Sequence, residues 1–325
     1  MSKFVSICTP TFNRRYFFQA LIEMIRSQDY PHTLLEWVIG DDGSDSIEDL
    51  IKDIKFIKVR YFRIQKQETL GWKRNFLNQK ANGDIIVYFD DDDYYPPNRI
   101  SNGVKLLTQN PSYKIAGSSL MHIFYHHLNE IYKCGPYGKN HATAATFIFH
   151  KNLLEETHFD NESLVGEEKF FLKNHSIPIL QLDSKSTILV IAHEQNSYDK
   201  KKLLENLEQS KMVRTDLKLD NFIKYYFQNL NLIEFYKKDL HVLLKNYSLG
   251  SIDHKKDIKD YITEKEKKSQ IIKDKVEKYK NNVISNEKTN EEYENKLKQK
   301  TILIQKLLVE IKELKEELSA LKNNR

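Results

Sequence analysis

Short apolar runs alternate with amphipathic stretches over the first 200 residues of the chain. The apolar runs predict buried strands at residues 4–8, 34–39, 56–62, 84–89 and 186–192. The stretches between them repeat apolar residues at helical spacing and predict helices at residues 16–27, 47–54, 71–80 and 97–109. Strands that alternate with helices are typical of an α/β fold with a mostly parallel, doubly wound, Rossmann-like sheet.

Polar clusters follow three of these predicted strands. They occupy residues 9–14, 41–44 and 90–93. In doubly wound folds, ligands bind at the carboxyl ends of the strands, so these clusters should lie close together at one edge of the sheet. The sequence therefore predicts a binding site at that edge.

The strand at residues 84–89 is followed by four consecutive carboxylates, Asp90, Asp91, Asp92 and Asp93. Such a group repels itself unless some members are protonated or a cation is shared. Carboxylate ligands suit Mg²⁺ or Mn²⁺, and a site with few protein ligands leaves room for substrate phosphates. A solvated acidic turn before the next helix is the alternative.

The strand at residues 186–192 ends at His193. An imidazole there could complete a metal site or bind a diphosphate oxygen. A histidine with a purely structural role is the alternative.

Proline and glycine, the residues typical of turns, are confined almost entirely to the first half of the chain. All seven prolines lie at or before Pro178, and Gly250 alone among the ten glycines lies beyond Gly166. The rest should be largely helical. Residues 201–250 predict a helical subdomain, because apolar residues between Phe222 and Leu240 recur at spacings of three and four.

The sequence of residues 251–325 is typical of a charged helix that ends in a coiled coil. A heptad register can be written from residue 276 onward. Its a positions are Val276, Val283, Asn290, Leu297, Ile304, Ile311 and Leu318, and its d positions are Tyr279, Asn286, Tyr293, Lys300, Leu307, Leu314 and Leu321. This pattern favours a parallel homodimer. One long helix folded back on its own domain is the alternative.

Composition and charge narrow the class of protein. Of the net charge of +5 over 325 residues, most lies in residues 251–325, with 19 Lys and Arg against 15 Asp and Glu. The remainder is nearly neutral, which argues against nucleic-acid binding. No apolar stretch is long enough for a membrane span, and two cysteines make no disulfide framework, so we expect a cytoplasmic protein.

Three motifs in order resemble those of the family 2 glycosyltransferases with the GT-A fold. VSICTPTFNR at residues 5–14 is similar to the opening strand and nucleotide loop, VIGDDGS at 38–44 to the second motif, and GDIIVYFDDDD at 83–93 to the DxD region. PNRI at 97–100 follows at the family's usual place. The resemblance implies a GT-A domain over residues 1–200.

The resemblance also implies site residues. Thr9, Thr11 and Arg14 would line the nucleotide pocket, and Arg74 could reach the nucleotide. Asp42 would accept the uracil N3 proton if the donor is a UDP-sugar. Asp90 would lie near the ribose. Asp92 would hold the Mn²⁺ or Mg²⁺ that bridges the diphosphate, with Asp91 as a competing ligand.

The family supplies a catalytic base from an acidic motif before a helix. VGEEKFFL at residues 165–172 stands at that place, with Glu168 where an Asp is usual. We expect Glu168 to take the proton of the acceptor hydroxyl, and Glu167 is the alternative. Two exposed acids favoured by the helix dipole are the structural alternative.

The sequence thus predicts a metal-dependent, inverting glycosyltransferase that moves a sugar from a nucleotide-sugar, which we expect to be UDP-linked, to a hydroxyl of a glycan, lipid or protein. A nucleotide-sugar-binding protein and a coiled-coil scaffold with an inactive domain are the alternatives. A nucleotidyltransferase would normally carry a glycine-rich phosphate loop, whereas residues 9–14 contain no glycine.

Overall fold

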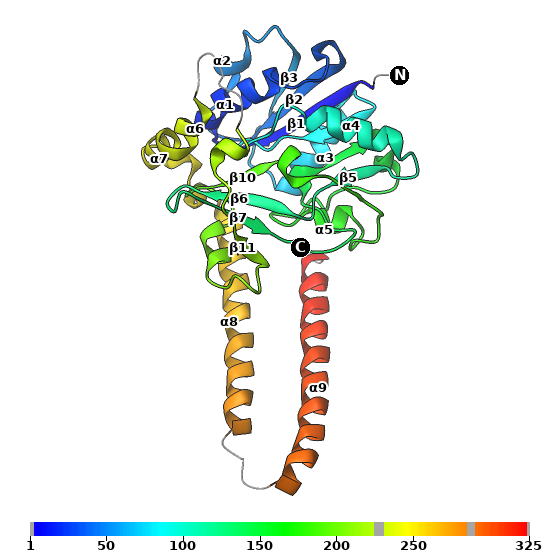
Figure 1. Ribbon diagram of the computed structural model, residues 1–325, viewed down its shortest axis with the longest axis vertical. Coiled ribbons are helices and arrows are strands. Elements are labelled where there is room, and N and C mark those ends of the chain that lie inside the picture. The colour runs from blue at the N-terminus through cyan, green and yellow to red at the C-terminus, as the bar shows by residue number, and fades with distance from the viewer. Residues whose placement is uncertain (1–2, 224–230, 285–289, 324–325) are drawn as a thin grey trace. The chain divides into compact units, whose positions relative to one another are not determined.

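The structure is a computed structural model that describes residues 3–223, 231–284 and 290–323. The chain divides into two compact units, Met1–Lys259 and Asp260–Arg325 (Figure 1). The first unit contains the strands and all of the predicted site residues. The second consists of most of one long helix and all of another.

A mixed sheet lies at the centre of the first unit. In the described part of the chain it has seven strands in the order β3-β2-β1-β4-β8-β5-β9. Their bounds are β1 Val5–Thr11, β2 Leu35–Asp41, β3 Lys58–Arg63, β4 Ile85–Tyr88, β5 Ile115–Gly117, β8 Ile148–His150 and β9 Leu180–Gln181. β1 pairs in parallel with β2 and β4, and β2 pairs in parallel with β3. The predicted mostly parallel α/β sheet is confirmed.

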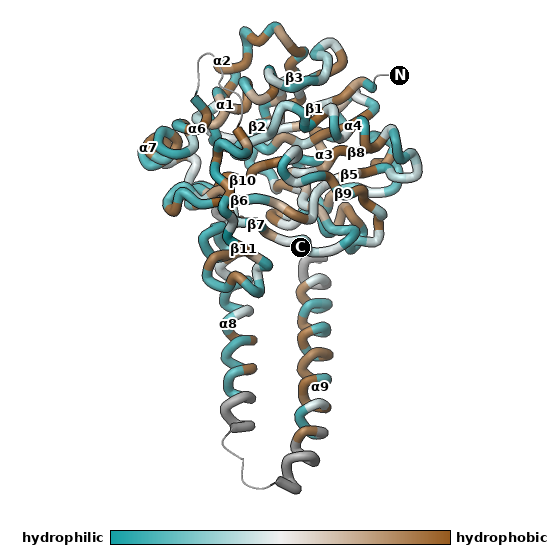
Figure 2. The backbone as a smooth tube through the Cα atoms, in the orientation of Figure 1, coloured by the Kyte–Doolittle hydropathy of each residue, from teal (hydrophilic) through white to brown (hydrophobic). Residues whose placement is uncertain are grey.

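Side chains of the inner strands point alternately to the two faces of the sheet, and each face packs against its own apolar layer. Val5 and Ile7 of β1 pack with α1 and α4, whereas Cys8 packs with α3 on the other face. Figure 2 shows the apolar positions gathered along these strands. The helices are α1 Arg15–Arg26, α2 Glu48–Ile51, α3 Leu70–Lys80, α4 Arg99–Gln109 and α5 Glu168–Phe171. Packing in these two layers holds the strands in place, and thereby also the polar clusters that follow the strand ends.

A smaller sheet has the order β10-β6-β7-β11. Its strands are β6 Met121–Tyr125, β7 Glu130–Cys134, β10 Leu189–Ala192 and β11 Met212–Arg214. Tyr94, beyond the acidic run, forms an antiparallel bridge with Leu189 of β10. This bridge brings the end of β10 close to the loop that follows β4.

Residues 201–250 differ in part from the predicted helical subdomain. Met212–Arg214 form β11 instead of a helix, because they pair with β7. Short 3-10 helices lie at Lys200–Leu204 and Leu219–Asn221. α6 Leu232–Glu234 continues through a π-helical turn, Phe235–Asp239, into α7 Leu240–Lys245. Residues 224–230 of the predicted helix lie outside the described residues. Leu232, Phe235 and Leu240 are buried in the same core as the two sheets.

The second unit contains most of α8 Lys256–Ile284 and all of α9 Asn290–Asn323. The predicted helical character of this region is confirmed, and its pairing as a coiled coil stays a prediction. Several apolar side chains of α9 are exposed, among them Ile304 at 57% and Leu314 at 46%. Asn286 lies outside the described residues, as do the side chains of Tyr279, Val283, Asn290, Tyr293 and Leu321.

Among the described residues, no helix has both the length and the apolar character that a membrane span requires.

Candidate active site

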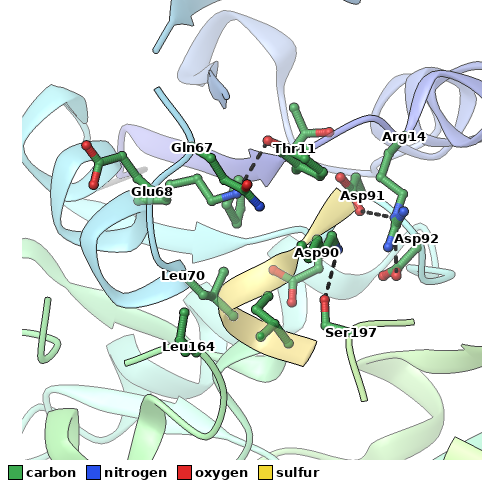
Figure 3. A pocket seen from close by; sticks show the side chains of 15 residues that line it. Thr11, Arg14, Gln67, Glu68, Leu70, Asp90, Asp91, Asp92, Leu164 and Ser197 are labelled. Carbon is green, nitrogen blue, oxygen red and sulfur yellow. Dashed lines mark hydrogen bonds and ion pairs between the residues drawn. The ribbon is translucent and has the colours of Figure 1, made fainter. Parts of the chain in front are cut away.

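A cavity of about 120 Å³ opens where β1 and β4 end (Figure 3). Six stretches that are far apart in the sequence supply its described lining. The lining residues are Pro10, Thr11, Phe12, Arg14, Gln67, Glu68, Leu70, Lys73, Asp90, Asp91, Asp92, Leu164, Ser197, Lys255 and Ile258. The predicted convergence of the loops after β1 and β4 is therefore present, with cations facing carboxylates across a small space.

Three of the four consecutive aspartates line this cavity, and the fourth does not. Asp93 is buried, and its Oδ1 accepts a hydrogen bond of 3.0 Å from the backbone N–H of Ile191 in β10. Burial and the charge of Asp92 raise the pKa of Asp93 above its usual range. Asn98, and not Asp93, takes the cap position of α4.

Asp92 of the cavity lining contacts His193, which is buried and does not belong to the described lining. His193 Nε2 lies 3.1 Å from Asp92 Oδ2, and the side-chain amide of Asn196 is 3.4 Å from the same oxygen. Burial lowers the pKa of His193 to about 4, so its imidazole is neutral at pH 7. Burial opposes ionisation of Asp92, yet the hydrogen bond from His193 holds the pKa of Asp92 below its usual range. A carboxylate beside a neutral imidazole is a donor set that fits Mn²⁺ or Mg²⁺.

Arg14 lies between this pair and the neighbouring aspartate. Its Nε is 3.9 Å from Asp91 Oδ1 and 3.9 Å from Asp92 Oδ2. The backbone carbonyls of Gly250 and Gln195 accept hydrogen bonds from its two terminal nitrogens. Burial and the charge of Asp92 raise the pKa of Asp91 to about 7. Arg14 is thus fixed in the cavity wall, where a diphosphate could share its charge.

Asp42 and Lys73 form a buried ion pair beside the cavity. Lys73 Nζ lies 2.8 Å from Asp42 Oδ1, and Asp42 Oδ2 accepts a hydrogen bond of 2.8 Å from the backbone N–H of Glu68. Only 7% of Lys73 is exposed. The Lys73 ammonium is thus buried, and it needs the Asp42 carboxylate as counter-charge.

Thr9 and Thr11 occupy different places although both belong to β1. Thr11 lines the cavity, as predicted. Thr9 is fully buried, and its Oγ1 accepts a hydrogen bond of 2.9 Å from the Trp37 indole of β2. The structure therefore places Thr9 in the packing between strands and apart from the described lining of the cavity.

Arg74 joins two acidic residues. Its terminal nitrogens bind both Asp90 oxygens at 3.1 and 3.0 Å, its Nε lies 2.7 Å from Glu167 Oε1, and its guanidinium covers the Tyr88 ring. Asp90 lines the cavity, whereas Arg74 is absent from its described lining. Arg74 thus positions Asp90, and its contact with the nucleotide stays a prediction.

The two candidate bases have different surroundings. Glu167 is buried in the ion pair with Arg74. Glu168 begins α5 and is partly buried. Burial and the charge of Glu167 raise the pKa of Glu168 to about 7, which suits a group that accepts a proton near neutral pH. Neither belongs to the described lining, although Leu164 from the same loop does.

Lys255 is a site residue that the sequence analysis missed. It is 6% exposed, its Nζ donates a 2.9 Å hydrogen bond to Ser197 Oγ, and the ammonium lies 5.6 Å from the centre of the Phe12 ring. Burial, reinforced by the charges of Arg14 and Lys73, lowers its pKa. The sequence placed Lys255 at the start of the charged tail.

The segment that carries Lys255 is tied to the loop after β1. Asn13 Nδ2 donates a 2.9 Å hydrogen bond to the carbonyl of Leu249. A Cβ on Gly250 would overlap the Gln195 side-chain oxygen and lie 3.0 Å from the carbonyl oxygen of Asn13. Gly250, which stands apart from the other glycines in the sequence, is therefore the one sequence feature that points to the close packing of this segment.

Comparisons with known proteins agree with this architecture. A family model described as Glycosyl transferase family 2 matches residues 6–146. A GalNAc(5)-diNAcBac-PP-undecaprenol beta-1,3-glucosyltransferase of Campylobacter jejuni is 26% identical over 279 residues, 75% of this chain and 84% of that protein. A poly(ribitol-phosphate) beta-N-acetylglucosaminyltransferase of Staphylococcus aureus is 26% identical over 117 residues, 34% of this chain and 20% of its own length.

A solved structure shares the fold at low sequence identity. The mannosyltransferase PcManGT from Pyrobaculum calidifontis, in complex with GDP-Man and Mn²⁺, aligns with a TM-score of 0.50 and 15% identity, over 63% of this chain and 65% of that chain. Its likeness supports the GT-A type of α/β fold. The ordered motifs, the cavity at their strand ends and the family match lead to one conclusion: residues 6–146 form a glycosyl transferase family 2 domain.

Proposed function

We propose that the chain is a metal-dependent, inverting glycosyltransferase that moves a sugar from a nucleoside diphosphate to a hydroxyl acceptor. The observation that carries this proposal is the cavity where Arg14, Lys73 and Lys255 face Asp90, Asp91 and Asp92. Buried cations beside carboxylates suit a bound diphosphate together with a divalent ion. The neutral His193 next to Asp92 adds a nitrogen ligand for that ion.

In this proposal Asp92 and His193 hold Mn²⁺ or Mg²⁺, with Asp91 as an additional ligand. When bound, the ion offsets the charge that develops on the departing nucleoside diphosphate. Arg14 and Lys255 would bind phosphate oxygens from the protein side. Arg74 would keep Asp90 in place beside the ribose, because it binds both carboxylate oxygens.

Glu168 is the proposed base. It would accept the proton of the acceptor hydroxyl while the oxygen attacks the anomeric carbon from the face opposite the nucleotide. The pKa of about 7 gives Glu168 both an ionised fraction and useful basicity near neutral pH. Glu167 is engaged by Arg74 at 2.7 Å, which makes it the weaker candidate.

Uracil is the proposed nucleobase of the nucleotide-sugar donor. Both Asp42 oxygens already accept a hydrogen bond, yet each has a further lone pair that could accept the uracil N3–H. The acceptor class is proposed from the Campylobacter jejuni relative, whose name describes a glycan on undecaprenyl diphosphate. We propose a hydroxyl of a glycan, including a lipid-linked glycan, as the acceptor.

A donor screen tests the proposal. UDP-sugars and GDP-sugars are added with Mn²⁺, and the melting temperature and the slow release of nucleoside diphosphate are recorded. A ligand at 100 times its Kd stabilises a protein by about 2.7 kcal/mol, which such a melt resolves. Stabilisation and hydrolysis with UDP-sugars alone are expected. A GDP-sugar response would overturn the uracil assignment, and no response to any nucleotide-sugar would overturn the transferase proposal.

A further inference from the structure

Two histidines and a glutamate gather outside the cavity described above. His126 follows β6, Glu194 follows β10, and His241 belongs to α7. One ligand atom from each residue can be chosen such that all three lie within 4.8 Å of one another. The polypeptide thus brings three separate elements together at a point where each offers a metal-binding side chain.

The distances centre on the carboxylate. His241 Nδ1 lies 2.6 Å from Glu194 Oε1, and His126 Nε2 lies 3.5 Å from the same oxygen. The two imidazole rings are tilted against each other with their centres 4.5 Å apart. In a tetrahedral zinc site with bonds of about 2.0 Å, ligand atoms are about 3.3 Å apart. Small side-chain movements would therefore suffice to enclose an ion.

The hydrogen bonding of His126 favours a cation at this point. His126 Nδ1 lies 3.4 Å from the backbone carbonyl oxygen of Ala192, which can only accept a hydrogen bond. Nδ1 can therefore act as donor to this carbonyl, which leaves Nε2, the nitrogen that faces the Glu194 carboxylate, as the ligand atom of the ring. A metal-bound histidine is commonly held in this way by a carbonyl on its other nitrogen.

We propose that His126, Glu194 and His241 form a second metal site, and that its ion is Zn²⁺. Two imidazoles and one carboxylate are a known zinc ligand set, and the exposed sides of Glu194 and His241 leave a fourth position for water. The ion would fasten α7 to the ends of β6 and β10. Because Glu194 directly follows His193, the site would also hold the loop that carries the proposed active-site histidine. The inference is independent of the proposed transfer reaction.

A zinc titration against a chromophoric chelator tests the site. The Asp92→Asn variant serves as background, because it removes the proposed carboxylate ligand from the active site. We expect one equivalent of Zn²⁺ to bind this variant tightly and to raise its melting temperature. Loss of outer hydrogen-bond partners alone costs 10- to 100-fold in metal affinity, so adding His241→Ala should cost at least 100-fold.

Two further variants make the result specific. Glu194→Gln keeps the side-chain shape and should weaken zinc binding as His241→Ala does. His158→Ala removes an exposed imidazole elsewhere and should leave the affinity unchanged. Tight zinc binding that survives both His241→Ala and Glu194→Gln would overturn the proposal. So would an Asp92→Asn protein that binds no Zn²⁺ at micromolar concentration, in which case the cluster is a hydrogen-bonded polar contact.

Discussion

Glu167 and Glu168 are adjacent in sequence but have different surroundings. Glu167 forms a buried ion pair with Arg74, whereas burial and the charge of Glu167 raise the pKa of Glu168 to about 7. A carboxylate with a raised pKa beside a paired carboxylate is a common arrangement for proton transfer. The structure thus gives a physical reason to prefer Glu168 over Glu167 as the base.

Substitution of the proposed base should act on turnover. We expect Glu168→Gln to lose about 10² to 10⁴ in kcat, the usual range for a positioned acid–base group, with nearly unchanged donor affinity. Glu167→Gln should reduce kcat less. Steady-state kinetics and donor titration measure both effects. If Glu167→Gln proves the more damaging, the assignment of the base is wrong.

The pH dependence of turnover should follow the same group. A base works only when deprotonated, and the pKa of Glu168 is about 7. We therefore expect kcat to fall as the pH drops below about 7 and to level off above it. The profile is recorded at saturating donor, with melting curves at each pH as a control for unfolding. A kcat that is constant from pH 5 to 8 would contradict a base with this pKa.

Lys255 offers a second test at the scale of a residue. A charged hydrogen bond contributes about 1.5 to 3 kcal/mol, so Lys255→Met should weaken donor binding by about 10- to 100-fold. Lys245→Met, on the exposed side of α7, is the matched control and should change nothing. Equal donor affinities in these two variants would remove Lys255 from the site.

At the scale of elements, one wall of the cavity is built jointly by three segments. They are the loop after β1, the loop after β4 and the segment around Gly250. Asn13 and Arg14 bind the carbonyls of Leu249 and Gly250, so the last part of the first compact unit holds the opening loop in place. The side chain of Gln195 reaches the same segment through the carbonyls of Leu244 and Tyr247. The rigidity of the cavity wall therefore depends on residues more than 200 positions apart.

Gly250→Ala should disturb this wall. The new Cβ would overlap the Gln195 side chain, and such overpacking typically costs about 1 to 3 kcal/mol. We expect a lower melting temperature together with weaker donor binding. Gly138→Ala is the control, because its Cβ would meet only ordinary contact at 3.8 Å. A Gly250→Ala protein with normal stability and donor affinity would show that the segment tolerates displacement.

The sequence predicted the long elements better than the short ones. β1, β2 and β4 are continuous apolar runs between turn residues, and the structure has them within three residues of the predicted ends. β9 has two residues and β11 three, too few for a periodic pattern. Thr9 and Lys255 show the remaining limit: their partners, Trp37 and Ser197, lie far away in sequence, and only the fold brings them together.

At the scale of the whole molecule, the exposed apolar residues of α9 raise the question of assembly. We propose that the heptads pair two chains in a parallel dimer. Ile304 and Leu314 are exposed in one chain, and Leu307, Ile311 and Leu318 are partly exposed. Each well-buried Leu or Ile contributes about 1.5 to 3 kcal/mol, so pairing would offset the entropy of association.

Removal of residues 301–325 tests this proposal. The shortened protein should be a monomer, or a much weaker oligomer, in light scattering, and should keep its donor affinity because the site residues lie in the first compact unit. A full-length protein that is already monomeric at micromolar concentration would contradict the dimer.

The proposed function depends most on the metal-assisted donor site. Its most direct test is calorimetric titration of UDP, in the presence of Mn²⁺, into the wild-type protein and the Asp92→Asn variant. We predict that the wild type binds UDP only with the ion and that Asp92→Asn loses this binding while it keeps its circular dichroism and melting temperature. Equal, Mn²⁺-dependent affinity in the two proteins would contradict the account.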